Sequence, residues 1–333
     1  MRLDLVKMHG SSNDILIVKK TREQLFETAE KADEFVRQVC DRNGPLGSDG
    51  IYFIDLEANP ITAEFYNPDG SFAGMCGNGL RAIARLILEI SDVKETLIMS
   101  DGNSFHGSLT DSFPGVTSTC ISTNSISFKA DSLPIKTDQI EFILQEIPES
   151  GTDLKFTALS IPNDHVVTIS DEFDEAQFMS VGEKLSVPNK LLENGANVSF
   201  IVPISDDEFF VRTFERGAGP TASCGSGMTA SRAVLSKLGL HTADKKVLIR
   251  NVGGPAYVSL STDTDGNWFG QLDGNATYVY KASVELNDFN SESAIEVSEF
   301  TQDLAAYNEV FTQNQKAIED AGIKCDFSSS DVT

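Results

Sequence analysis

Apolar positions along the chain fall into short runs that predict strands in both halves. Residues 51–55, 62–66, 210–214 and 277–280 are rich in aromatic and β-branched side chains, a composition typical of strands. Residues 22–41, 80–90 and 228–238 instead have the apolar spacing of helices. The first stretch is amphipathic, whereas the other two are apolar on most faces and should be buried. We therefore predict an α/β (α+β) protein in which sheets wrap around central helices.

The chain repeats one arrangement of motifs. Asn13-Asp14 opens a strand-like run and Cys76-Gly-Asn-Gly follows 63 residues later; Asn163-Asp164 and Cys224-Gly-Ser-Gly are 61 residues apart. Two motifs with matched order and spacing indicate two similar domains. The Ser/Thr-rich stretch 118–138 is the expected boundary, which gives domains at 1–130 and 131–276.

The tail, residues 287–333, differs from the rest of the chain. It holds ten acidic side chains against two lysines, and Phe300, Leu304, Tyr307 and Phe311 recur at helical spacing. We expect a surface helix packed on the body of the protein, followed by a frayed end from about Ser328. A partner-binding tail is the alternative.

Charge excludes several kinds of partner. The formal net charge is −24, from 50 acidic and 26 basic side chains, whereas nucleic acids and anionic membranes are bound through basic patches. No apolar run reaches the length of a membrane span, and the N-terminus is charged where a signal peptide would be apolar. A cytoplasmic protein with a small-molecule partner is expected, and a homodimer remains possible.

No cofactor is expected. The chain has four histidines without a pair at ligand spacing, and neither a Walker A nor a G-x-G-x-x-G motif, so metal and nucleotide sites have no support. Nothing in the sequence points to a pyridoxal-phosphate lysine.

Five cysteines occur, at positions 40, 76, 120, 224 and 325, without a C-x-x-C pair, so free thiols are expected. Cys76 and Cys224 each precede a Gly-x-Gly that opens a predicted helix. Unpaired amides and the partial positive charge of a helix start can bind a carboxylate. The same field is expected to lower the pKa of the thiol from about 8.5 towards neutrality.

Two such thiols would permit racemisation without a cofactor. One thiolate removes the α-proton of an amino acid, and the other thiol delivers a proton to the opposite face. A simpler explanation for one motif is a tight turn into a helix, but two copies at matched spacing favour the catalytic interpretation. Glu215 and His165 could orient or polarise the thiols, although a structural hydrogen bond would explain either residue alone.

Seven segments of the chain form an ordered set: residues 7–14 (KMHGSSND), 67–71 (NPDGS), 76–79 (CGNG), 163–165 (NDH), 196–197 (AN), 215–219 (ERGAG) and 224–227 (CGSG). With these segments in this order, and Gly253-Gly254 also fitting, the chain resembles the diaminopimelate epimerase family over about residues 1–286. The resemblance implies two pseudo-symmetric domains, each a barrel-like, mostly antiparallel sheet around a central helix. It also implies an active site in the cleft between the domains and a last strand, near 277–286, that returns to the first domain.

The resemblance further implies the roles of individual residues. Cys76 and Cys224 would be the acid and base, assisted by Glu215 and His165. The substrate-binding residues would be Asn13, Asn67, Gly77, Asn78, Asn163, Asn197, Glu215, Arg216, Gly225 and Ser226. Backbone groups at 77, 78, 225 and 226 would bind the reacting carboxylate, while the Asn and Arg side chains would read the distal end of the substrate, since an Arg fork suits a carboxylate.

The chain departs from the family at four points. The family usually has Gly at Ser12, Pro at Asp164 and Glu at Pro220, and its tail is usually shorter. Of these, Asp164 and Pro220 bear on the substrate, because they flank substrate-contacting positions. The leading hypothesis is an isomerase that interconverts LL- and meso-diaminopimelate in lysine and cell-wall biosynthesis. A racemase of another amino acid such as histidine, a PhzF-like isomerase and a non-catalytic binding protein are the alternatives.

Overall fold

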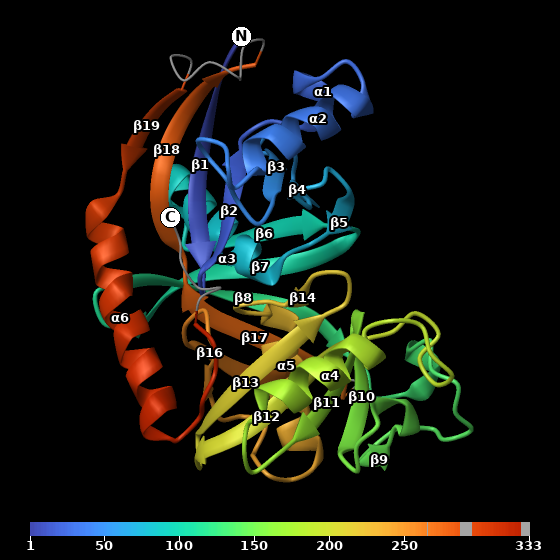
Figure 1. Ribbon diagram of the computed structural model, residues 1–333. Helices are drawn as coiled ribbons and strands as arrows, with labels where there is room; N and C mark the ends of the chain where they lie inside the picture. The colour runs from blue at the N-terminus through green and yellow to red at the C-terminus, as the bar shows by residue number, and fades with distance from the viewer. Residues whose placement is uncertain (265, 287–294, 328–333) are drawn as a thin grey trace. The chain divides into compact units, whose positions relative to one another are not determined.

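The computed structural model describes residues 1–264, 266–286 and 295–327, which fold into two units (Figure 1). Unit 1 comprises Met1–Ile121 and Gly274–Glu309. Unit 2 comprises Ser122–Asp273 and, of the described residues, 310–327. The chain passes between the units within β8 (Val116–Ile126), at the junction of residues 273 and 274 in β17 (Trp268–Asn275), and within α6 (Thr301–Asp320).

Unit 1 is a sheet around one helix. Its strands are β1 (Arg2–Gly10), β2 (Asn13–Val18), β3 (Ile51–Asp55), β4 (Ile61–Tyr66), β5 (Phe72–Gly74), β6 (Glu95–Ser100), β7 (Asn103–Phe113), β18 (Thr277–Glu285) and β19 (Ile295–Glu299). From β1 the successive pairings are antiparallel to β2, parallel to β3, antiparallel to β4, parallel to β6 and antiparallel to β7. On its other side β1 pairs with β18, so a strand from near the end of the chain completes this sheet.

Unit 2 repeats this succession of pairings. Its strands are β9 (Gln145–Glu146), β10 (Lys155–Ile161), β11 (Asn163–Ile169), β12 (Asn197–Ser205), β13 (Glu208–Glu215), β14 (Gly219–Pro220), β15 (Val247–Arg250) and β16 (Ala256–Thr262). From β10 the pairings are antiparallel to β11, parallel to β12, antiparallel to β13, parallel to β15 and antiparallel to β16. The motif repeat in the sequence therefore corresponds to a repeat in topology.

A buried helix occupies the middle of each sheet (Figure 1). In unit 1 this helix is α3 (Gly77–Ser91), in which every residue from Asn78 to Leu88 is buried. In unit 2 it is α5 (Gly225–Lys237), which packs among β10, β11, β12, β13 and β16. Both helices are apolar on the faces that meet the strands, so burial of that surface stabilises their position. The predicted fold class is confirmed.

One expected helix is wrong in its extent. Residues 22–41 form two helices, α1 (Arg22–Leu25) and α2 (Ala29–Cys40), instead of one. Phe26 has an extended backbone that ends α1. The Thr28 hydroxyl then accepts a hydrogen bond from the Lys31 amide and caps α2. A good N-cap in the middle of an apolar pattern starts a new helix.

The tail forms the predicted helix, α6, beginning directly after Phe300. Within unit 1, Asp303 of α6 pairs with Arg85 of α3. Within unit 2, Asn314 donates to the Asn251 carbonyl at 2.9 Å, and Ile318 packs into an apolar cluster with Val202. The expected frayed end from Ser328 lies outside the described residues.

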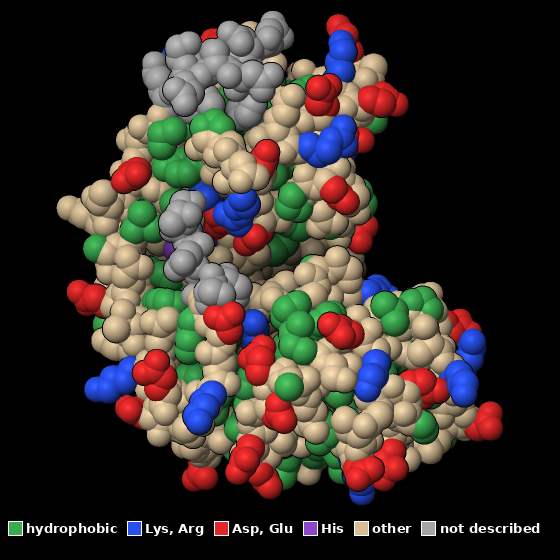
Figure 2. Space-filling model, viewed as in Figure 1, with side chains coloured by type: hydrophobic (Ala, Val, Ile, Leu, Met, Phe, Trp, Pro, Cys, Tyr) green, Lys and Arg blue, Asp and Glu red, His purple; other side chains and the backbone are tan. Residues whose placement is uncertain are grey.

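The remaining elements are α4 (Glu175–Leu185) and two short 3-10 helices, Ala130–Ser132 and Pro148–Ser150. On the face shown in Figure 2, acidic and basic side chains are scattered among one another. Within the described residues, no helix combines the length and the apolar character that crossing a membrane requires.

Truncating α3 on its buried side should destabilise the protein. Ile83 is 0 % exposed and Ile90, on the same helix, is 52 % exposed. Ile83→Ala is expected to lower the free energy of unfolding by about 2–5 kcal/mol, whereas Ile90→Ala should change it by less than about 0.5 kcal/mol. Urea denaturation followed by circular dichroism measures both variants. Equal losses would contradict the central position of α3.

Candidate active site

Cys76 lies at the start of the central helix of unit 1. It is the N-cap of α3, and its sulfur accepts from the Gly79 amide at 3.5 Å. The Tyr52 hydroxyl accepts from the Cys76 backbone N–H at 2.7 Å. A Cβ on Gly79 would lie 2.6 Å from the Tyr52 ring. The second glycine of the motif therefore allows the helix start to lie directly against β3.

The Cys76 thiol faces an oriented amide. Its Sγ donates to Oδ1 of Asn13 at 3.1 Å. The Nδ2 of Asn13 donates to the Asp49 carboxylate at 2.9 Å, and this carboxylate also pairs with Arg42 at 2.6 Å. Because the amide nitrogen is held by Asp49, the amide oxygen is turned towards the sulfur. Asp49, Arg42 and Tyr52 were not predicted as site residues. Tyr52, for example, has the sequence features of an ordinary strand residue.

The other predicted residues of unit 1 lie in two places. Gly77 and Asn78 form the first turn of α3, next to Cys76; amides at such positions have no carbonyl partner within the helix. Asn67 lies in the turn after β4, and its Nδ2 donates to the Ser71 hydroxyl at 3.0 Å.

Cys224 has the equivalent position in unit 2. It is the N-cap of α5, and its sulfur accepts from the Gly227 amide at 3.3 Å and lies 3.5 Å from the Ser226 hydroxyl. A Cβ on Gly227 would lie 2.4 Å from the Thr213 hydroxyl. As in unit 1, the second glycine lets the helix start approach the sheet closely.

The expectation of a lowered thiol pKa is wrong for Cys224. Burial raises its pKa well above the usual value, and the neighbouring Glu215 carboxylate raises it further; the Ser226 hydroxyl and the Gly227 amide oppose this shift. The helix start thus acts in the expected direction, but desolvation of the thiolate outweighs it. Cys224 holds its proton in this environment.

A hydrogen-bonded chain of amides borders Cys224. Asn163 donates to the Ser226 hydroxyl at 3.1 Å, and its Oδ1 lies 3.1 Å from Nε2 of His165. That nitrogen also lies 3.5 Å from Nδ2 of Asn197. Burial lowers the pKa of His165 to about 3, with a smaller contribution from Arg216 in the same direction, so the ring is neutral. The hydrogen bonds of His165 go to substrate-binding candidates and not to a thiol.

Glu215 is the last residue of β13 and Arg216 follows it, beside these hydrogen-bonded side chains. The Thr221 hydroxyl donates to Glu215, and the Arg216 amide donates to Oδ1 of Asn197 at 2.9 Å. The Arg216 guanidinium, 38 % exposed, pairs with Asp164 at 3.2 Å. This last contact was not predicted, although Asp164 was recognised as a departure. A carboxylate of the chain itself thus already neutralises part of the Arg216 charge.

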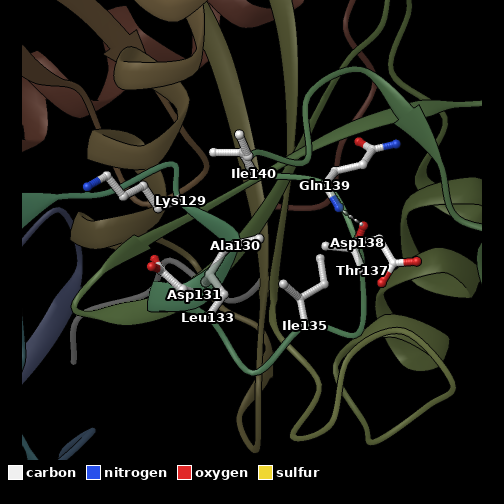
Figure 3. Close-up of a pocket in the computed structure, with 9 residues that line it drawn as sticks. All are labelled: Lys129, Ala130, Asp131, Leu133, Ile135, Thr137, Asp138, Gln139 and Ile140. Atoms are coloured by element: carbon white, nitrogen blue, oxygen red, sulfur yellow. Dashed lines mark hydrogen bonds between the residues drawn. The ribbon is translucent and has the colours of Figure 1, made fainter.

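A surface pocket lies apart from these residues. A pocket of about 390 Å³ in unit 2 is lined by residues 129–131, 133, 135 and 137–140, in the connection that precedes β9 (Figure 3). None of the predicted site residues lines this pocket, and it contains neither a thiol nor an imidazole. Among the residues that the structure describes, no group of three His, Cys, Asp or Glu side chains is placed to hold a metal ion.

Comparison with known sequences identifies the family of the chain. The diaminopimelate epimerase family pattern matches residues 5–113 and 157–279, which include both cysteines and their helices. This chain belongs to the diaminopimelate epimerase family. The diaminopimelate epimerase of Listeria monocytogenes serovar 1/2a is 33 % identical over 324 residues, covering 92 % of this chain and 95 % of the relative. The protein is accordingly an isomerase, as predicted.

Solved structures with lower identity share the fold. A PhzF-family phenazine biosynthesis protein from Bacillus anthracis superposes with a TM-score of 0.62 at 15 % identity, covering 86 % of this chain and 99 % of the other. A hydroxyproline epimerase from Agrobacterium vitis gives a TM-score of 0.58 at 14 % identity, covering 88 % and 98 %. Epimerases of the diaminopimelate family thus share an architecture with proteins of other named activities.

Removing the charge of Glu215 should activate the Cys224 thiol. Glu215 raises the pKa of Cys224, so Glu215→Gln lowers that pKa and increases the thiolate fraction at any pH below it. Alkylation of Cys224 by iodoacetamide, followed by peptide mass spectrometry, should accelerate at least roughly threefold. Glu183→Gln, an exposed position on α4, is the control. An unchanged or slower alkylation of Cys224 in Glu215→Gln would contradict the assigned interaction.

Proposed function

We propose that the protein is a pyridoxal-phosphate-independent epimerase that interconverts LL- and meso-diaminopimelate by two-base proton transfer between Cys76 and Cys224. One observation carries the proposal: each unit places a thiol at the N-cap of its buried central helix, with the sulfur accepting from the amide of the third helical residue. The same backbone placement of a thiol, present in both units, would supply one proton-transfer group for each of the two faces of one α-carbon.

The reaction needs one thiolate and one thiol. The thiolate takes the α-proton, the electron pair stays on the α-carbon as a carbanion, and the other S–H delivers its proton to the opposite face. The first sulfur then holds the proton that it removed. In the structure Cys76 donates a hydrogen bond to Asn13 and burial keeps Cys224 protonated, so one of the thiols must ionise before turnover.

The helix starts would stabilise the charge that develops. Backbone amides at Gly77 and Asn78 in unit 1, and at Gly225 and Ser226 in unit 2, are suited to bind the reacting carboxylate. Preorganised N–H donors stabilise a carbanion delocalised into that carboxylate more than they stabilise the ground state. Glu215 would favour the protonated form of Cys224 between turnovers.

Side-chain amides and one guanidinium would bind the distal end of the substrate. Asn67, Asn163, Asn197 and Arg216 are candidates to bind the second amino-acid group of diaminopimelate. His165 would fix two of these amides, since its Nε2 lies within 3.5 Å of both Asn163 and Asn197.

The Asp164–Arg216 pair favours one alternative substrate class. Because Asp164 already binds the Arg216 guanidinium, a distal carboxylate must displace or share it. An amino acid without a distal carboxylate, such as histidine, has no such requirement. A racemase of another amino acid is therefore the second candidate function.

An exchange experiment in deuterated water separates these functions. Incorporation of deuterium at the α-carbon is measured by NMR for LL- and meso-diaminopimelate, histidine and proline. We expect exchange with diaminopimelate and little with the others. If histidine exchanges and diaminopimelate does not, the proposed substrate is wrong but the proposed proton transfer stands. If no amino acid exchanges its α-proton, the proposed reaction itself is wrong.

Single thiol variants test the two-base chemistry in the same assay. Cys76→Ala and Cys224→Ala should each lower the rate of inversion at least about a hundredfold, with Cys120→Ala as the matched control. Full activity in either single variant would instead support a PhzF-like isomerase, which does not require two thiols.

A further inference from the structure

The turn between β1 and β2 is strained. β1 ends at Gly10 and β2 begins at Asn13, and these two residues pair across the hairpin. The turn residues Ser11 and Ser12 have φ values of 51° and 60°. Two-residue hairpin turns with positive φ at both positions favour glycine or asparagine, because a Cβ is crowded in the left-handed region. Two serines hold this conformation only if neighbouring groups fix it.

The neighbouring groups are buried polar atoms of unit 1. The Ser11 amide donates to Oδ1 of Asn275 at 2.7 Å, and Arg81 of α3 donates to the Ser11 hydroxyl at 3.1 Å. The Ser12 amide donates to Nδ1 of His9 at 3.3 Å. His9 and both serines are buried. Ser11 is thus held directly, whereas Ser12 depends on the position of the His9 ring.

Two groups contact this ring: Nδ2 of Asn275 lies 3.4 Å from His9 Nδ1, and the C-terminal helix supplies the second. Tyr307 of α6 is 3 % exposed, and its ring packs edge-on against His9 with centroids 4.5 Å apart and planes at 74°. The Ser12 side chain also interacts with the Tyr307 hydroxyl: burial raises the pKa of Tyr307, and Ser12 opposes this rise. One turn earlier, Asp303 accepts from Arg85 and from the Tyr278 amide and anchors α6 on this unit.

The residue that follows the turn contacts the Cys76 thiol. Asn13 follows Ser12 in the chain, and its Oδ1 accepts from Cys76 Sγ at 3.1 Å. A displacement of Ser12 therefore moves the amide that faces the sulfur. Tyr307 lies beyond residue 279, where the match to the family pattern ends, so this contact is an addition to the matched part of the chain.

We propose that Tyr307 is a positioning residue for the Cys76 half of the site: it holds Ser12 and His9 so that the strained turn keeps Asn13 facing the thiol. The expected loss of turnover rests on the proposed function. The effect of Tyr307 on the Cys76 thiol can be measured without a substrate.

A double-mutant cycle of Tyr307→Phe and Ser12→Gly tests this proposal. Tyr307→Phe keeps the ring and removes the hydroxyl that interacts with Ser12. Because Asn13 then binds the S–H less well, alkylation of Cys76 at a fixed pH should accelerate roughly threefold, and kcat/KM should fall about three- to tenfold. Glycine adopts the turn without help, so Tyr307→Phe should have little further effect in the Ser12→Gly background.

Tyr278→Phe is the matched control. It also removes a tyrosine hydroxyl of unit 1, the one that donates to Glu89 at 2.8 Å, and should leave the alkylation of Cys76 unchanged. Asp303→Asn, which loosens the anchor of α6, should shift the alkylation in the same direction as Tyr307→Phe.

Three outcomes would overturn the positioning role. These are wild-type alkylation of Cys76 in Tyr307→Phe, an equally large effect of that substitution in the Ser12→Gly background, and an equal effect of Tyr278→Phe. If the protein exchanges no amino-acid proton at all, the proposed function fails, but the alkylation rates still decide the role of Tyr307.

Discussion

The close approach of a helix start to a sheet, permitted by one glycine in each unit, is the constraint on which both half-sites depend. At Gly79 and Gly227 a Cβ would lie 2.6 Å from the Tyr52 ring and 2.4 Å from the Thr213 hydroxyl. Any larger residue would push the helix away from the strand and carry the N-cap cysteine with it. Burial of the rest of each helix then fixes the sulfur in place, so the apolar core and the chemistry are parts of the same packing.

The two half-sites share this frame but surround their thiols differently. Cys76 is half-buried and faces an amide that Asp49 orients. Cys224 is buried beside a carboxylate, and both effects keep its proton in place. The two thiols therefore share their place at a helix start, while burial and the Glu215 carboxylate raise the pKa of Cys224.

Much of this arrangement could be predicted from the sequence, since it is local. The Cys-Gly-x-Gly motifs, the apolar helices that follow them and the matched spacing of the two halves are visible in short windows. The break in residues 22–41 was missed because the capping role of Thr28 competes with an apolar pattern that continues across it. The raised pKa of Cys224 was missed because the field of a helix start can be inferred from a motif, whereas the loss of solvent around a thiol depends on the whole fold. Contacts such as Asp49 with Asn13, or Tyr307 with His9, join residues far apart in the chain and leave no pattern along it.

The most direct test of the two-thiol account follows the origin of the proton in the product. LL-diaminopimelate is converted in deuterated water, and early samples are analysed by mass spectrometry for deuterium in the meso product and in the remaining LL substrate. If one thiolate removes the proton and the other thiol delivers one from solvent, the product carries deuterium from the first turnovers while the LL pool keeps its protium. A product that retains the substrate's own proton would show that a single base acts on both faces, and would contradict the account.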